Sequence, residues 1–170
     1  MSSKNSLKIK GFKSINIPSQ NNGKPFVDIK NFKKARKIPG FLSEEEVLRI
    51  LNSASLIGKN KLEKTRNKAL IEILYASGMR VSELVSLRKS LFIGMPEIIL
   101  IKGKGNKERM VPISKLAISA IRKYLAELKK TNIEFYESDF LFPSRSKNGY
   151  LNRERFFLII KEIANYAGLN

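Results

Sequence analysis

The sequence predicts a mainly α-helical domain of the α+β class, with a small antiparallel β-sheet and a basic segment in front of it. Two observations carry this prediction. Apolar residues recur with the helical period of about 3.6 residues in several stretches between residues 43 and 168. Two short runs rich in β-branched residues are separated by a glycine-rich turn, which is typical of a β-hairpin.

The size and composition of the chain favour one compact domain. Its 170 residues are 42% hydrophobic, which is enough for one core, and the chain is too short for two substantial domains. No uncharged apolar stretch of about 18 residues and no signal-peptide core occurs, so we expect a cytoplasmic protein that does not enter a membrane. Cysteine and histidine are absent, which excludes disulfides, thiolate chemistry and ordinary zinc sites, and we expect neither cofactor nor metal.

The charge of the chain points to a polyanionic partner. Lysine and arginine outnumber aspartate and glutamate by 33 to 15, which gives a net charge of +18. Such a balance favours nucleic acid, because cations that bind phosphates release the counterions around them. Composition alone leaves open a generic basic protein whose charge serves only solubility.

Residues 1–40 predict a basic linker or tail. They hold ten Lys or Arg residues against one acid, Asp28, and this surplus of nine is half of the net charge. They show no sustained apolar period. We interpret the segment as either a strap that follows DNA or a disordered tail, and the domain as beginning at residue 41. Its candidate DNA contacts are Lys33, Lys34, Arg36 and Lys37.

Three helices are predicted in the first half of the domain. The first spans about residues 43–56 and begins with a capping box formed by Ser43 and Glu46. A second helix, about 62–77, is apolar on all sides and should be the core helix. We expect Gly78 to cap this helix in the left-handed conformation, after which a short third helix begins at once. The side chains expected on the buried sides of the first and third helices are Val47, Leu48, Leu51, Ala54, Val81, Leu84 and Val85.

The second half combines the hairpin with two further helices. Residues 97–102 and 107–113 are the two β-branched runs. The helical period returns over about 114–130, and a loop is expected at 141–143. Asn152 should cap a last helix, which Gly168 ends.

One candidate site lies at the start of the third helix. Arg80 follows a glycine cap directly, so its guanidinium should lie beside free backbone N–H groups, a geometry suited to holding a phosphate. Glu83 lies three residues further on, where it can orient that guanidinium. On spacing alone, an ordinary surface Arg–Glu pair is the simpler interpretation.

A second candidate site is the hairpin tip, which gathers four cations: Lys102, Lys104, Lys107 and Arg109. Glycines let the backbone approach a ligand closely, and a lysine at such a tip can enter a DNA groove or donate a proton to a leaving alkoxide. The alternative is a solvated turn whose charges discourage edge pairing. A nucleotide-binding Walker loop is disfavoured, since a strand follows the glycines and the Gly-Lys-Ser/Thr ending is missing.

Together these two segments closely resemble the tyrosine recombinases, the phage integrase family, and within them the Xer-type recombinases that resolve chromosome dimers. LYASGMRVSELVSL resembles the first-arginine motif of the family, and IKGKGNKERMVPIS resembles its hairpin-lysine motif, in the expected order. FLSEEEV and FLFPSRSKNGYLNRERF are similar to flanking stretches. The resemblance implies that residues 41–170 form the N-terminal portion of the recombinase catalytic-domain fold.

The resemblance also implies a role for each matching residue. Arg80 would clamp the scissile phosphate as charge builds on its oxygens, and Glu83 would support Arg80. Lys104 would be the general acid for the leaving 5′-hydroxyl. Plain contacts to the DNA backbone would come from Lys102, Lys107 and Arg109.

The chain departs from the family pattern at its C-terminal side. The family's His-x-x-Arg motif, its further His or Trp and its nucleophilic tyrosine have no match, and the tyrosines of this chain, Tyr75, Tyr124, Tyr136, Tyr150 and Tyr166, fall elsewhere in the motif order. Helical spacing places Tyr75 and Tyr124 in the core. We therefore expect a partial catalytic domain that, as these residues alone, is inactive and forms no covalent adduct with DNA.

Three functions remain open at this point. The first is a DNA-binding fragment of a site-specific recombinase, an enzyme family that cuts and rejoins DNA during integration and recombination. The second is a catalytically inactive DNA-binding remnant of a split gene, and the third is a basic RNA-associated protein. The expected partners are double-stranded DNA and other recombinase subunits, without a membrane or a small-molecule cofactor.

Overall fold

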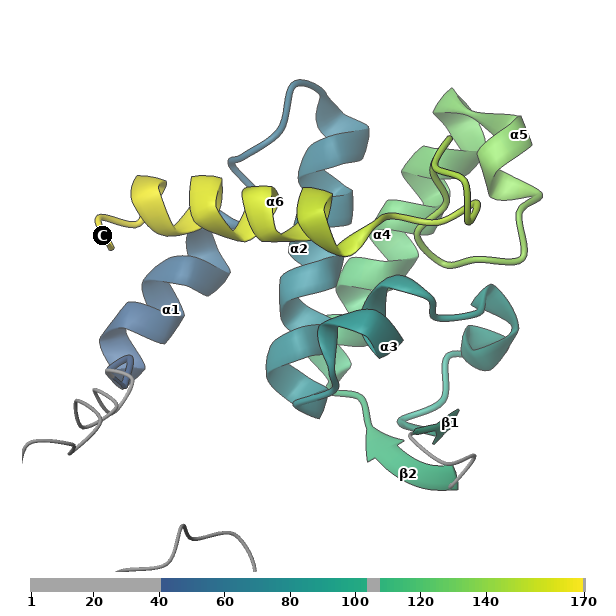
Figure 1. Ribbon diagram of the computed structural model, residues 1–170, viewed down its shortest axis with the longest axis horizontal. Coiled ribbons are helices and arrows are strands. Elements are labelled where there is room, and N and C mark those ends of the chain that lie inside the picture. Colours follow the sequence, from purple (N-terminus) through teal and green to yellow (C-terminus); the bar gives the residue numbers. More distant parts are fainter. Residues whose placement is uncertain (1–40, 104–107, 170) are drawn as a thin grey trace, which may run out of the picture. The chain divides into compact units, whose positions relative to one another are not determined.

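The computed structural model describes residues 41–103 and 108–169, which form helices together with one small β-hairpin (Figure 1). This confirms the predicted mainly α-helical class with a small antiparallel sheet. The elements in chain order are α1 (Glu44–Ser53), α2 (Lys61–Ser77), α3 (Val81–Val85), the 3₁₀ turn η1 (Lys89–Phe92), β1 (Ile98–Lys102), β2 (Glu108–Pro112), α4 (Lys115–Thr131), α5 (Ile133–Tyr136) and α6 (Arg153–Tyr166).

Polar side chains cap the helices where the sequence indicates. At α1 the predicted capping box is present: Glu46 N donates to Ser43 Oγ at 3.2 Å, and Ser43 N donates to Glu46 Oε2 at 2.7 Å. Asn60, Ser114 and Asn152 cap α2, α4 and α6 in the simpler way, each accepting one backbone N–H. These bonds satisfy N–H groups that have no partner within the helix.

The core of the domain lies between α2 and α4, which pack along each other. Leu70 and Ile73 of α2 and Ile121 of α4 are fully buried. Tyr124 of α4 stacks on Phe142 with ring centroids 5.6 Å apart. The prediction that the second helix is the core helix is therefore confirmed, because α2 also contacts α1, α3 and β2.

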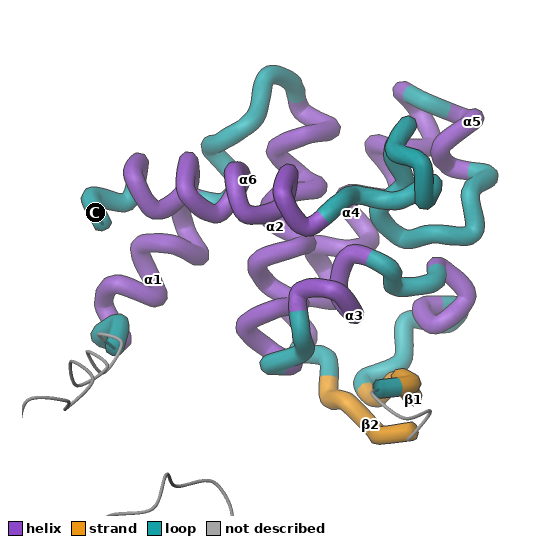
Figure 2. Tube along the Cα trace, in the orientation of Figure 1, coloured by secondary structure: helices purple, strands orange, loops and turns teal. Residues whose placement is uncertain are grey.

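Figure 2 shows the two strands, β1 and β2, in orange. They pair antiparallel, with a register that runs from Ile98 opposite Pro112 to Lys102 opposite Glu108. Alternate residues point to opposite faces of a strand. The face that carries Ile99, Ile101 and Val111 is buried, and the opposite face is exposed. On β2, the side chain of Arg109 lies on the same inward face as that of Val111.

Two side chains expected in the core are exposed. Leu48 is 57% exposed, because the buried stripe of α1 follows Val47, Ile50, Leu51 and Ala54, and Leu48 lies about 100° away from Val47 around the helix. Tyr75 is 64% exposed. It shares a face with Ile71 one turn earlier, but the neighbours that bury Ile71 do not extend over the last turn of α2. Tyr124, by contrast, is buried as expected.

The segment between α5 and α6 contributes to the core although it has no helix or strand. Leu141 and Phe142 are completely buried there, and Leu151 N donates to Phe142 O at 2.9 Å, which ties the two sides of the loop together. The loop leads directly into α6, whose buried face carries Phe156, Ile159 and Ile163. Within the described part of the chain, none of the helices is both long and apolar enough to cross a bilayer.

Candidate functional site

The site is built on the sharp connection between α2 and α3. Gly78 ends α2 with a φ of 57°, a left-handed conformation that suits glycine. Met79 is buried and anchors the turn. Arg80 then takes an extended conformation as the N-cap residue of α3, and its carbonyl accepts the N–H of Leu84 at 2.9 Å. The Arg80 side chain is 65% exposed, so its guanidinium is open to a ligand.

Glu83 holds Arg80 at two points. Its Oε2 accepts the backbone N–H of Arg80 at 2.9 Å, and its Oε1 accepts from Nη1 of Arg80 at 3.1 Å. The structure therefore brings together the two residues that the sequence predicted to pair. The first contact satisfies a backbone donor at the start of the helix, and the second restrains the guanidinium.

Arg109 of β2 binds the same carboxylate from the other side. Its Nη1 donates to Glu83 Oε1 at 3.0 Å, and its Nη2 donates to Glu83 Oε2 at 2.6 Å, which is a bidentate pair. Sequence reasoning treated Arg109 only as a DNA-backbone contact. The period of β2 indicates that Arg109 needs a partner, because Arg109 and Val111 share the inward face of the strand, but it does not indicate that the partner is Glu83.

The carboxyl group of Glu83 is held in its ionised form. Its pKa falls from an ordinary 4.5 to about 2, mainly because of the hydrogen bonds from Arg109 and, against the opposing effect of partial burial, those from the Arg80 backbone and side chain. The side chain of Glu83 is only 13% exposed. Two guanidinium groups around one carboxylate leave this part of the surface with a net positive charge, which favours an anionic ligand.

Glu83 should make the stability of the domain depend on acidic pH. Its lowered pKa means that its stabilisation is complete above about pH 4.5 and is lost as the pH falls toward about 2. Glu83→Gln removes this contribution. As the pH falls from about 4.5 to about 2, the free energy of unfolding of the wild type should therefore decrease by about 1–2 kcal/mol more than that of the variant. Urea unfolding at several pH values measures the difference. The exposed Glu162→Gln serves as control, and equal slopes for all three proteins would contradict the role of Glu83.

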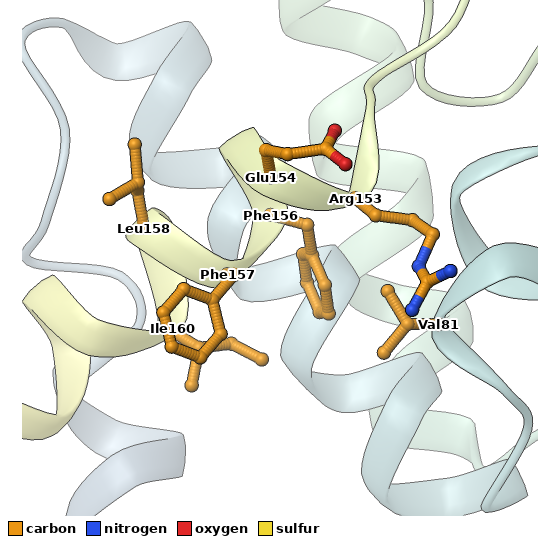
Figure 3. Close-up of a pocket in the computed structure, with 7 residues that line it drawn as sticks. All are labelled: Val81, Arg153, Glu154, Phe156, Phe157, Leu158 and Ile160. Atoms are coloured by element: carbon orange, nitrogen blue, oxygen red, sulfur yellow. The ribbon is translucent and has the colours of Figure 1, made fainter.

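The first turn of α6 lies beside the start of α3. An open hollow of about 550 Å³ is lined by Val81, Arg153, Glu154, Phe156, Phe157, Leu158 and Ile160. In Figure 3 the guanidinium of Arg153 lies next to Val81, the residue that follows Arg80. Sequence reasoning did not identify Arg153, since nothing local relates it to a residue more than seventy positions earlier.

Of the remaining predicted site residues, the structure describes only Lys102, and its ionic partner is Glu108 rather than Glu83. Lys102 lies at the end of β1, where its Nζ is 3.6 Å from Glu108 Oε1 and its side chain is 66% exposed. Lys104 and Lys107 of the hairpin tip, and Lys33, Lys34, Arg36 and Lys37 of the basic segment, lie outside the described residues. Across residues 41–103 and 108–169, no three Asp or Glu side chains gather in a way that could hold a metal ion.

Residues 40–170 match the phage integrase family. The chain is 45% identical over 141 residues to tyrosine recombinase XerD of Rhizobium meliloti, an alignment that covers 81% of this chain and 44% of the relative. It is 38% identical over 156 residues to tyrosine recombinase XerD of Rickettsia prowazekii, with 86% and 49% covered. The chain thus spans about half the length of the curated relatives it matches.

Solved structures of recombinases also superpose on this chain. The XerA recombinase superposes with a TM-score of 0.63 and 28% identity, covering 81% of this chain and 46% of that one. The XerH site-specific recombinase, in a pre-cleavage complex with its difH substrate, superposes with a TM-score of 0.65 and 31% identity, covering 79% and 38%. These matches and the Arg80–Glu83 motif agree that the chain belongs to the phage integrase family of tyrosine recombinases, and that its relatives are of the Xer type.

Proposed function

We propose that this chain binds duplex DNA and holds the scissile phosphate in a site-specific recombination reaction that cuts and rejoins DNA. The observation that carries the proposal is the exposed guanidinium of Arg80, which Glu83 holds in place at the start of α3. A donor fixed before the reaction stabilises charge on the phosphate oxygens without having to reorganise as that charge develops. A related recombinase has been captured with its DNA substrate before cleavage, which supports DNA as the ligand.

The other cations have supporting roles in this proposal. Lys104 is the general acid that protonates the leaving 5′-hydroxyl, a role that rests on the match of the hairpin sequence to the family motif. Lys102, Lys107 and the basic segment contact phosphates without reading sequence. Their contribution is supported by the net charge of +18, which acts on any DNA backbone. A recombination partner would be a further recombinase subunit, and the reaction would take place in the cytoplasm.

Duplex DNA should bind in a way that tolerates sequence and weakens strongly with salt. If about six phosphates are contacted, affinity should fall roughly a thousandfold between 50 mM and 200 mM salt. Titration of a labelled duplex at several salt concentrations measures this slope. Removal of residues 1–40 takes away half of the net charge and should flatten the slope more than any single substitution in the domain.

Two controls separate this proposal from the alternatives. A duplex of RNA with the same sequence tests for an RNA-associated protein, and equal affinity for the two duplexes would contradict the proposal. Absence of binding to DNA at low salt, or an affinity that does not change with salt, would contradict the electrostatic argument on which the proposal depends.

A further inference from the structure

We propose that Arg109 is a positioning residue, which acts through Glu83 to fix the Arg80 guanidinium in the orientation that receives a phosphate. The inference rests on the function proposed above and adds to it a residue of β2. It differs from the plain DNA-backbone contact that the sequence predicts for Arg109, because here the partner of the arginine is a carboxylate of the protein.

The geometry of the carboxylate supports this role. Each oxygen of Glu83 lies between one donor of Arg109 and one donor of Arg80: Oε1 accepts at 3.0 and 3.1 Å, and Oε2 accepts at 2.6 and 2.9 Å. The positions of both carboxylate oxygens are therefore fixed by the two arginines together. Rotation of the Glu83 carboxylate about its last side-chain bond would break all four contacts at once.

Arg109 supplies the more rigid of the two anchors. It makes two parallel hydrogen bonds, whereas the guanidinium of Arg80 makes one, and parallel bonds define an orientation as well as a distance. Arg109 lies on β2, which is held in the core by Val111 and by Ile113, the residue that follows the strand; both are 3% exposed. By contrast, α3 has only five residues and an i,i+3 pair on such a helix contributes little order alone.

The two arginines that share the Glu83 carboxylate therefore have different roles. Arg80 has the more exposed side chain, 65% against 38% for Arg109, and so offers its free donors to a ligand. Arg109 directs its donors inward and fixes the carboxylate. A phosphate that approaches Arg80 meets a guanidinium whose orientation is already set, which reduces the ordering needed on binding.

The first test follows the carboxyl group of Glu83 by carbon-detected NMR titration in the full 170-residue chain. The charged groups that act on Glu83 are Arg109 of β2 and Arg80 at the start of α3. Arg109→Ala should raise the pKa of Glu83 from about 2 by about one unit or more, because the largest stabilising contact of the anion is removed. Lys102→Ala, on the neighbouring strand, should leave it unchanged.

Two further variants keep this test decisive. Arg109→Lys retains the charge but not the fork, so it should restore only part of the shift. It also replaces Arg109→Ala if the alanine variant loses the amide spectrum of the folded protein. A Glu83 that titrates in both variants as it does in the wild type would overturn the proposal.

The second test is a double-mutant cycle on DNA affinity. If Arg109 acts through Arg80, Arg109→Ala should weaken duplex binding about three- to tenfold in the wild type and less than about twofold in an Arg80→Ala background. Lys102→Ala should have the same effect in both backgrounds. Equal losses from Arg109→Ala in the two backgrounds would show a plain phosphate contact and overturn the proposal. Failure of the wild type to bind DNA would overturn the proposed function instead, and the Glu83 titration would still decide the role of Arg109.

Discussion

Replacing Arg80 with alanine is expected to lower DNA strand cleavage by at least about a hundredfold while duplex affinity changes by about tenfold or less. The reason is that Arg80 interacts most strongly with charge that develops in the transition state, whereas many other cations share the binding of the ground state. The measurement uses a complete recombinase in which residues 41–170 replace the matching segment of a relative such as XerD of Rhizobium meliloti. Cleavage is followed on a labelled substrate at saturating protein.

Three variants make this result specific. Arg80→Lys should not restore cleavage, because lysine lacks the planar fork that holds two phosphate oxygens. Lys104→Ala should reduce cleavage in the same manner if it is the general acid. Arg88→Ala is the matched control: this exposed arginine lies over the ring of Phe140 at 4.2 Å and pairs with Asp139 at 3.2 Å, and its loss should leave cleavage close to that of the wild type. Unchanged cleavage in Arg80→Ala would remove Arg80 from the site.

The second large effect is expected for the stability of the domain and uses two neighbouring phenylalanines of α6. Phe156 is fully buried, whereas Phe157 is 65% exposed. Phe156→Ala should lower the free energy of unfolding by about 3–5 kcal/mol, since it removes a buried ring and leaves a cavity. Phe157→Ala should change it by less than about 1 kcal/mol. Urea unfolding of the two variants and the wild type measures this contrast, and similar losses in both would mean that α6 does not pack through Phe156.

The helices and the hairpin could be predicted from the sequence, because their signals are local. The periodic apolar residues of α4, the side-chain caps at Ser43 and Asn152 and the glycine-rich turn between the strands each act within a few residues. The pairing of Arg80 with Glu83 belongs to the same class, since residues three apart on a helix are always neighbours. None of these features depends on which elements pack against each other.

Contacts between distant segments are different in kind. The approach of Arg109 to Glu83 and that of Arg153 to Val81 depend on how β2 and α6 pack against α3, and no local period encodes that packing. The exposure of Tyr75 has the same origin. The period of α2 places Tyr75 on the same face as Ile71, but only the packing of the whole domain determines how far along α2 this face is buried by neighbouring residues. Local pattern thus specifies which side of an element is apolar, whereas burial and the partner of an inward charge follow from packing between elements.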